Sequence, residues 1–320
     1  MQSISLIIQI FLVLAFGYFL GPKLSLNIRH FIFKILPYFS YILLTSVALE
    51  LTLALDQIDN PSTILPPALL IALTTSLGSF FTCLFAYTIF DKESVKGKIS
   101  LQLFMNALKN IAKAFLALTI GVILGILLTQ LHTHIPFNSW YLLLLFIFLI
   151  GIELAFTHFN RTWLSWKILI VPLAAFIGSC LAGFLNYSLL GHEFTLNEIL
   201  ALGQGYGWYS MSGILFTQLH SAELGGIALL TDLFREIVAI LLMYTMGWRF
   251  PRPAISSAGA TSMDVTLAMV KQSCGTHYVP HAMMSGLLLS LLAPLLITVF
   301  LNFKQLKQEL ISTFQLDFLR

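Results

Sequence analysis

Residues 203–213 read GQGYGWYSMSG, and they place glycines, aromatic rings and hydroxyls inside a segment that is otherwise apolar enough to lie in a bilayer. Residues 229–242, LLTDLFREIVAILL, follow with two acids and an arginine in a second apolar segment. Residues 259–264, GATSMD, bring a third interruption of this kind. Glycines and polar residues inside apolar segments are typical of membrane helices that break where they line a path for a solute.

The composition around these stretches predicts an all-α, polytopic membrane protein. Of the 320 residues, 58% are hydrophobic and 10% are charged, whereas a soluble globular domain is about 25% charged. Apolar runs of about 20 residues recur along the chain, which favours a helical bundle over a β-barrel. The first run is expected to be a retained span and not a signal peptide, because no base precedes it. We expect about eight transmembrane helices, at 4–20, 32–54, 66–90, 114–131, 139–157, 167–190, 225–247 and 281–302.

Two shorter apolar segments, 199–222 and 254–276, are broken by glycines. Lysine and arginine gather in the loops after the first, third and fifth spans, so the positive-inside rule places the N-terminus outside. If both short segments were complete spans, Arg249 and Arg252 would lie outside, against this rule. We therefore expect two re-entrant hairpins, although the basic C-terminal tail lies outside in either arrangement.

The first six spans contain an internal repeat. Three pieces recur at nearly constant offsets, which are FGYFLG and IGVILG (104 residues), SVALELTLA and LIGIELAFT (103 residues), and LGSFFTCLFAY and IGSCLAGFLNY (100 residues). Each copy holds three spans, so the second copy enters the membrane from the opposite side. Residues 1–95 and 96–192 are thus expected to form an inverted repeat, which is a common construction of secondary transporters.

A second repeat is expected in the unit 193–303, which precedes a tail at 304–320. GWYSMSGILFTQ at 207–218 matches GATSMDVTLAMV at 259–270 with an offset of 52 residues. The alignment places Asp264 where the first copy has a serine. If each copy is a hairpin followed by one span, the two hairpins enter from opposite faces of the membrane.

The acids of the span 225–247 are the first candidates for chemistry. Glu236 lies in its middle, where an acid costs about 2.5–3.5 kcal/mol on insertion scales, so Glu236 is expected to face a cavity or a partner. Asp232 lies one turn earlier on the same face, and Arg235 is within reach of Asp232. Two carboxylates on one face repel each other when both are charged, which favours exchange of protons. Alternatively, Asp232 and Arg235 form a structural pair.

The two broken segments supply the other candidates. Asp264 follows a glycine in a segment too short for an ordinary core helix, so its carboxylate is expected to hold a cation, or else to cap a helix. Aromatic faces hold an ammonium group with about 0.5–2 kcal/mol, and hydroxyls offer hydrogen bonds; the alternative for each ring is a place at the membrane interface. The candidates for these roles are Tyr206, Trp208, Tyr209, Ser210, Ser212 and Ser262.

Three further acids are candidates for gating or structural roles. Glu50 and Glu153 occupy equivalent repeat positions, and Asp56 lies just past the second span. No metal site is expected, because pairs such as His277 and His281 supply only two ligands. The sequence shows no Walker or dinucleotide glycine pattern and no basic-aromatic stripe, so we expect no cofactor, no ATPase or redox enzyme and no nucleic-acid partner.

The motifs GYGWYSMSGIL, TDLFREIVAIL and GATSMDVTL, followed by VPHAMMSGLLLSLLAPLLI, resemble the lysine exporter family (LysO type) of bacterial inner-membrane proteins. The resemblance is strongest from about 203 to 300, and the earlier residues agree in span pattern more than in identity. It implies export of L-lysine and of analogues such as thialysine, with eight spans and both termini outside. It also implies functional intramembrane acids, which match Glu236 and Asp264, and more loosely Asp56.

We accordingly expect a proton-coupled antiport transporter of the inner membrane, and not an enzyme, in which lysine and protons compete for Glu236 and Asp264. The alternatives are a monovalent cation/proton antiporter that uses the same two acids, or an exporter of another cationic amino acid. A carrier of anions would need unpaired bases, and Arg235 is the only deep one. The substrate range, the coupling ion and the formation of a homodimer stay open.

Overall fold

The computed structural model describes residues 2–55, 63–90, 101–131, 138–156 and 165–302, and this part of the chain is almost entirely helical. The prediction of a polytopic helical membrane protein is confirmed. The long helices are α1 (Gln2–Leu20), α2 (Leu26–Leu55), α3 (Leu65–Phe90), α4 (Leu101–Gln130), α5 (Ser139–Leu154), α6 (Trp166–Leu190), α9 (Ala222–Met246) and α12 (Val279–Leu301). Shorter elements between them are η1 (Gly21–Lys23), α7 (Leu196–Leu202), α8 (Tyr209–Leu219), α10 (Pro251–Ala258), η4 (Gly259–Met263), α11 (Leu267–Met269), η5 (Val270–Cys274) and η6 (Thr276–Tyr278).

Several of these helices are long and apolar enough to cross a membrane. Among the described residues the candidates are Leu65–Ile89, Phe104–Gln130, Trp166–Leu190 and Thr276–Leu301, and α2 adds a fifth if its two bent halves form one span. The helices α1 and α5 contain shorter apolar stretches. The helix α9 has the length of a span, but it carries Asp232, Arg235 and Glu236 in its interior.

Two helix starts differ from the prediction by more than three residues. The helix α4 begins at Leu101 and not at 114. Its first part is amphipathic, because Lys109 and Lys113 are exposed on one side while Ile111 is buried, so a segment with charges can still be helical. These lysines lie just before the apolar run that begins at 114, but the helix itself begins earlier in the sequence. The helix α2 begins at Leu26 and bends by 46° between its two halves, Leu26–Leu36 and Tyr38–Leu53. The bend lies at a proline, which lacks the N–H that would continue the helical hydrogen bonds.

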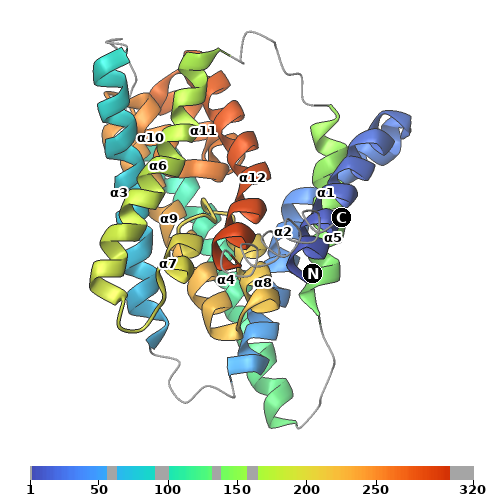
Figure 1. Cartoon of the computed structure of the whole chain (residues 1–320). Helices are drawn as coiled ribbons and strands as arrows, with labels where there is room; N and C mark the ends of the chain where they lie inside the picture. Colours follow the sequence, from blue (N-terminus) through green and yellow to red (C-terminus); the bar gives the residue numbers. More distant parts are fainter. Residues whose placement is uncertain (1, 56–62, 91–100, 132–137, 157–164, 303–320) are drawn as a thin grey trace, which may run out of the picture.

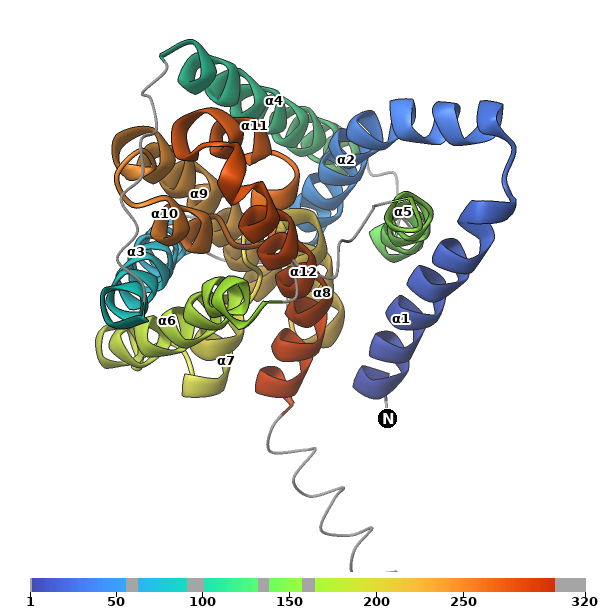
Figure 2. The same cartoon turned by 90° about the horizontal axis from the view of Figure 1, so that it is seen from above.

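The long helices of the first 190 residues pack in three pairs, α1 with α5, α2 with α4 and α3 with α6 (Figure 2). Glycines let the backbones approach closely in each pair. A Cβ on Gly17 of α1 would lie 2.3 Å from the carbonyl oxygen of Phe148 on α5. A Cβ on Gly121 of α4 would lie 2.3 Å from the carbonyl oxygen of Thr45 on α2. In the third pair, a Cβ on Gly178 would lie 2.5 Å from the backbone of Gly78.

The C-terminal unit contains two broken segments and two long helices. The first segment is α7 and α8 with the unwound stretch 203–208 between them. The second runs through α10, η4, α11 and η5. In Figure 1, α7 and α8 lie in the lower half of the molecule and α10 and α11 lie in the upper half, while α9 and α12 connect the two halves.

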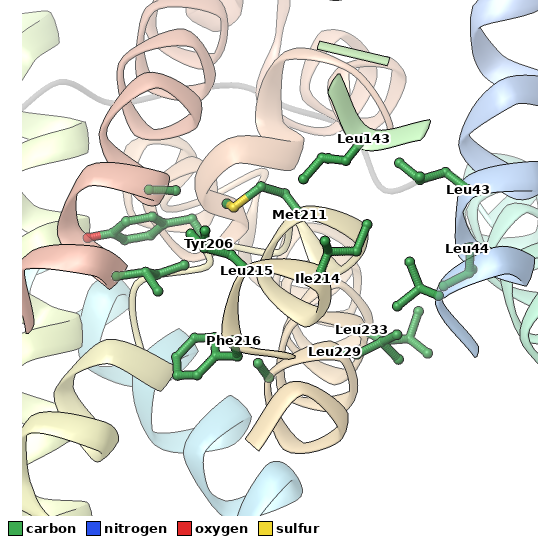
Figure 3. Close-up of a cluster of buried hydrophobic side chains, with 14 of the residues drawn as sticks. Leu43, Leu44, Leu143, Tyr206, Met211, Ile214, Leu215, Phe216, Leu229 and Leu233 are labelled. Carbon is green, nitrogen blue, oxygen red and sulfur yellow. The ribbon is translucent and has the colours of Figure 1, made fainter. Parts of the chain in front are cut away.

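A cluster of buried apolar side chains fixes α8 in place. Met211, Ile214 and Leu215 of α8 pack with residues of α2, α5 and α9, and each of the three is at most 1% exposed (Figure 3). The neighbouring side chains of this cluster that Figure 3 labels are Leu43, Leu44, Leu143, Tyr206, Phe216, Leu229 and Leu233. This packing fixes the position of α8, and the N-terminal end of α8 lies toward the centre of the molecule.

Candidate functional site

The two broken segments meet at their breaks. Gly207 and Gly259 both adopt positive φ angles, 88° and 62°, which are rare for residues with a side chain. The backbone N–H of Ala260 donates a hydrogen bond of 2.9 Å to the carbonyl of Tyr206. A Cβ on Gly259 would lie 2.8 Å from that same carbonyl oxygen, so only glycine fits there. The breaks are therefore a defined crossing point and not a loose loop.

Side chains of α9 form hydrogen bonds with the backbone of the first break, the unwound stretch 203–208. Asp232 Oδ1 accepts a hydrogen bond of 2.8 Å from the backbone N–H of Gly207. Gly205 lies directly against this carboxylate, since a Cβ there would be 1.7 Å from Asp232 Oδ2. Arg235 Nη1 donates to the carbonyl of Gly203 at 3.0 Å, and its guanidinium carbon lies 4.9 Å from the centre of the Tyr206 ring.

Arg235 also reaches the pair α3 and α6. Its Nη2 donates to Ser79 Oγ at 3.1 Å and to Ser179 Oγ at 3.2 Å, and these two hydroxyls are 3.4 Å apart. Ser79 and Ser179 are separated by the repeat offset of 100 residues. The hydrogen bonds of the Arg235 guanidinium thus go to hydroxyls and a carbonyl, and not to Asp232, as a simple Asp232–Arg235 pair would require.

A cavity of about 130 Å³ opens beside the crossing point. At about 30 Å³ for each water, this volume gives room for roughly four water molecules, or for a small polar solute. The residues that line it are Ser40, Phe146, Ile150, Gly207, Trp208, Tyr209, Ser210, Glu236, Ala260, Thr261, Met263, Asp264, Val265 and Ser290. They come from α2, α5, α9, α12 and both broken segments, so the cavity lies where most of the fold converges.

Two carboxylates face this cavity, one from each half of the C-terminal unit. Glu236 is 4% exposed, and its Oε2 has no hydrogen-bond partner among the described residues. Asp264 is exposed, and its Oδ1 accepts from the N–H of Val265 at 2.5 Å. The two acids lie within electrostatic range of each other, and Tyr209 is close to both. A buried carboxylate with an unused oxygen beside a second acid is suited to a cation or a proton.

The structure separates the other predicted site residues into two groups. Trp208, Tyr209 and Ser210 line the cavity at the N-terminal end of α8. The remaining three do not line it, and their hydroxyls bond elsewhere. Tyr206 donates to Gln204, Ser212 donates to the carbonyl of Tyr209, and Ser262 donates to the carbonyls of Gly259 and Ala282.

The capping alternative for Asp264 is wrong, because Thr266 is the residue at the N-cap of α11 while Asp264 follows the end of η4. The carboxylate of Asp264 is thus not used to begin a helix. Its nearest backbone donor is the N–H of Val265, the next residue.

The acids of the N-terminal repeat differ in their surroundings. Glu50 Oε2 accepts hydrogen bonds from the backbone N–H of Ser139, at 2.8 Å, and from the Ser139 hydroxyl. Glu50 therefore binds the first residue of α5. Glu153 is exposed near the end of α5 and lies within electrostatic range of Asp264. Asp56 lies outside the described residues.

Several lining residues were not among the sequence candidates. Ser40 and Ser290 reach the cavity from α2 and α12, and Thr261 reaches it from the second break. The available signal was a lone hydroxyl within a long apolar run, but many such hydroxyls only bond the carbonyl one turn back, as Thr298 does. Within the described part of the chain, no three His, Cys, Asp or Glu side chains gather as metal ligands, and the cysteines are free.

Comparison with known proteins identifies relatives of this chain. A sequence model of the family described as lysine exporter LysO matches residues 115–301. The chain is 36% identical over 183 residues to lysine exporter LysO of Escherichia coli (strain K12), which covers 57% of this chain and 60% of that protein. It is 32% identical over 190 residues to a Haemophilus influenzae protein described as a candidate lysine exporter, which covers 58% of this chain and 96% of that protein. The alignment thus spans less than two thirds of the E. coli protein, and no solved structure matches the chain.

Proposed function

Because the chain belongs to the lysine exporter LysO family, a family of transporters and not of enzymes, we propose that it exports L-lysine across the bacterial cytoplasmic membrane in exchange for protons. The residues that would hold both the ammonium groups and the exchanged protons are Glu236 and Asp264. Analogues such as thialysine, which keep both ammonium groups and the carboxylate, would use the same site.

The observation that carries this proposal is the pair of carboxylates in one cavity with an aromatic wall. An acid inside a membrane protein normally faces a cavity or a partner, and here Glu236 and Asp264 face the same cavity. Trp208 and Tyr209 line the same space, and aromatic faces attract ammonium groups. The N-terminal end of α8 also borders the cavity, and a helix N-terminus favours a carboxylate. These three features together match the charges of an amino acid with a cationic side chain.

Exchange follows from competition for the same carboxylates. While Glu236 and Asp264 are protonated, they have no charge to offer an ammonium group. Loss of the protons to one side creates the anionic form, to which lysine binds, and release of lysine on the other side lets protons return. Since both ligands need the same oxygens, neither crosses with the other still bound, and no separate coupling site is required.

We further propose that the transporter has eight spans and two re-entrant hairpins, with the N-terminus outside. In this architecture α7 with α8 and the segment from α10 to η5 are the hairpins, and 1–95 and 96–192 are inverted repeats. The pairing of the long helices supports the repeats, because exchanging the copies converts the pair α1 and α5 into the pair α4 and α2. The glycine contacts agree, since Gly17 against Phe148 corresponds to Gly121 against Thr45.

The proposal is tested with purified protein in proteoliposomes loaded with lysine. We expect lysine efflux to drive proton uptake into the vesicles, read by an internal pH-sensitive dye. Arginine and ornithine, tested in the same way, define the substrate range. Sodium or potassium gradients that drive proton movement in the absence of any amino acid would instead identify a cation/proton antiporter, and the lysine assignment would be wrong.

A further inference from the structure

We propose that Asp232 and Arg235 are positioning residues, which hold the first broken segment in shape and neither bind lysine nor carry its protons. This inference rests on the proposed function, because it divides the charged residues of α9 between the transport site and its support. Glu236 belongs to the site, and its two charged neighbours belong to the support.

The contacts of Asp232 point to a structural use of its charge. It is 1% exposed, and its Oδ1 accepts from the N–H of Gly207 at 2.8 Å. Gly207 adopts a positive φ of 88° and lines the cavity, whereas Asp232 does not. A carboxylate that accepts a backbone N–H in a buried place stabilises an unwound turn, because an unpartnered N–H there would be costly. Asp232 therefore holds Gly207, a residue of the cavity wall, in place without lining the cavity itself.

The contacts of Arg235 extend this support to two other helices. Arg235 is 1% exposed, and it donates to the carbonyl of Gly203 at the start of the break. The same guanidinium donates to Ser79 of α3 and Ser179 of α6. A planar guanidinium carries five N–H donors in a fixed fork, so it can bridge three acceptors in this way. Arg235 thus joins α9, the first break and the pair α3 and α6.

The geometry explains why Asp232, Arg235 and Glu236 lie within two turns of each other on α9. Asp232 and Glu236 are four residues apart and face the same side of the helix. Asp232 binds the break at Gly207, and Glu236, one turn further along, faces the cavity that this break borders. The opposite charges of Asp232 and Arg235 lie three residues apart, and of these three charged residues Glu236 is the one that lines the cavity.

The test uses the fact that an amide keeps the shape of a carboxylate but not its charge. Asn at position 232 still offers Oδ1 to the N–H of Gly207, but it neither exchanges a proton at this position nor holds an ammonium group by charge. Asp232→Asn leaves the Arg235 guanidinium and its three hydrogen bonds in place, so it is the decisive variant. We expect it to retain lysine-driven proton uptake within about fivefold of the unaltered protein, because a hydrogen bond to a neutral acceptor replaces one to a charged acceptor. Its proton-to-lysine ratio should be unchanged.

Further single variants serve as controls. Asp232→Ala removes the acceptor for Gly207, so the transport rate should fall by about tenfold or more, as expected for loss of a hydrogen bond to a charged group. Glu236→Gln, which is also isosteric, should abolish both lysine efflux and proton uptake. Thermal unfolding in detergent should rank the proteins without any substrate, with Asp232→Asn close to the unaltered protein and both Asp232→Ala and Arg235→Gln clearly below it.

The outcomes separate this inference from the function itself. If the unaltered protein moves no lysine, the proposed function fails, and the thermal ranking alone decides the positioning role. If the unaltered protein moves lysine but the folded Asp232→Asn variant behaves like Glu236→Gln, then the Asp232 carboxylate takes part in the exchange and the inference is overturned. An Asp232→Ala variant as stable as the unaltered protein would overturn it as well.

Discussion

The N–H of Ala260 donates a hydrogen bond of 2.9 Å to the carbonyl of Tyr206, so the two broken segments are bonded to each other at their breaks. Next to this bond lie Gly207 and Gly259, which both have positive φ angles and which match in the alignment of GWYSMSGILFTQ with GATSMDVTLAMV. Two unwound stretches that support each other expose backbone groups and helix ends at one point deep in the molecule. Beside this point the carboxylates of Glu236 in α9 and of Asp264, which follows η4, line one cavity.

Replacing Gly259 with alanine should disrupt this crossing. At φ 62° and ψ −125° a residue with a Cβ is strained by about 1–3 kcal/mol. The new Cβ would also lie 2.8 Å from the Tyr206 carbonyl oxygen and 2.9 Å from its Cβ, both of which are too close. We expect a lower thermal unfolding temperature in detergent and loss of lysine efflux.

Gly275→Ala is the matched control for this variant. Gly275 also has a positive φ, 103°, but nothing lies within 4 Å of a Cβ placed there. Its variant should show the backbone strain without the clash, and lysine efflux should persist. Equal losses of stability and transport in the two variants would mean that the crossing has no special importance.

Replacing either acid of the cavity with its amide should stop transport while leaving the fold intact. Glu236→Gln and Asp264→Asn keep the volume of each side chain but remove its charge, so an ammonium group loses its partner and no proton can be exchanged. Efflux from lysine-loaded vesicles should fall to the background of empty liposomes in both variants. Glu223→Gln, on the same helix but in its first turn, is the control and should transport normally. Substantial lysine-driven proton uptake by both cavity variants would refute the proposed site.

The long helices of the structure could be predicted from the sequence. The helices α3 (Leu65–Phe90) and α6 (Trp166–Leu190) begin and end within a residue of the predicted spans, because an apolar run of about 20 residues has one stable arrangement in a bilayer. The start of α4 could not be predicted in this way. Its charged first half is amphipathic, and such a segment forms a helix only because its apolar side packs on the rest of the protein.

The site could be predicted in part. The cost of an acid inside an apolar helix singled out Glu236, and the short, glycine-broken segment around it singled out Asp264. The partners of Asp232 and Arg235 could not be predicted, because they are set by residues far away in sequence. Ser79, for example, is 156 residues from Arg235. The position of Tyr206 could not be predicted either. We expected it beside the substrate, but its side chain is fully buried and Arg235 lies over its ring.

The indole of Trp208 should contribute to the affinity for lysine. Trp208 lines the cavity together with both acids, and a cation–π contact is worth about 0.5–2 kcal/mol. Trp208→Leu should therefore raise the KM for lysine efflux by roughly twofold to thirtyfold, with a smaller effect on the maximal rate. Trp248→Leu provides the control, since Trp248 is 38% exposed outside the cavity and should leave the KM unchanged. An unchanged KM in Trp208→Leu would exclude the ring from the binding site.

Glu50 and Glu153 occupy matching positions in the motifs SVALELTLA and LIGIELAFT, but their surroundings differ. Glu50 holds the first turn of α5 through Ser139, so Glu50→Ala should lower the stability by about 1–3 kcal/mol, the cost of losing a hydrogen bond to a charged group. Thermal unfolding and a denaturant titration in detergent measure this loss. Because Glu50 does not line the cavity, the variant should keep its KM for lysine.

Glu153 should instead act on transport through its charge. It is exposed and lies within electrostatic range of Asp264, so it attracts a cation toward the cavity from the end of α5. Glu153→Gln should raise the KM for lysine at low ionic strength, because it removes this charge. The difference from the unaltered protein should shrink as salt is added, because the screening length falls to about 10 Å at 0.1 M salt. A KM effect that is independent of salt would show that Glu153 contacts lysine directly, and a loss of stability equal to that of Glu50→Ala would assign it a structural role.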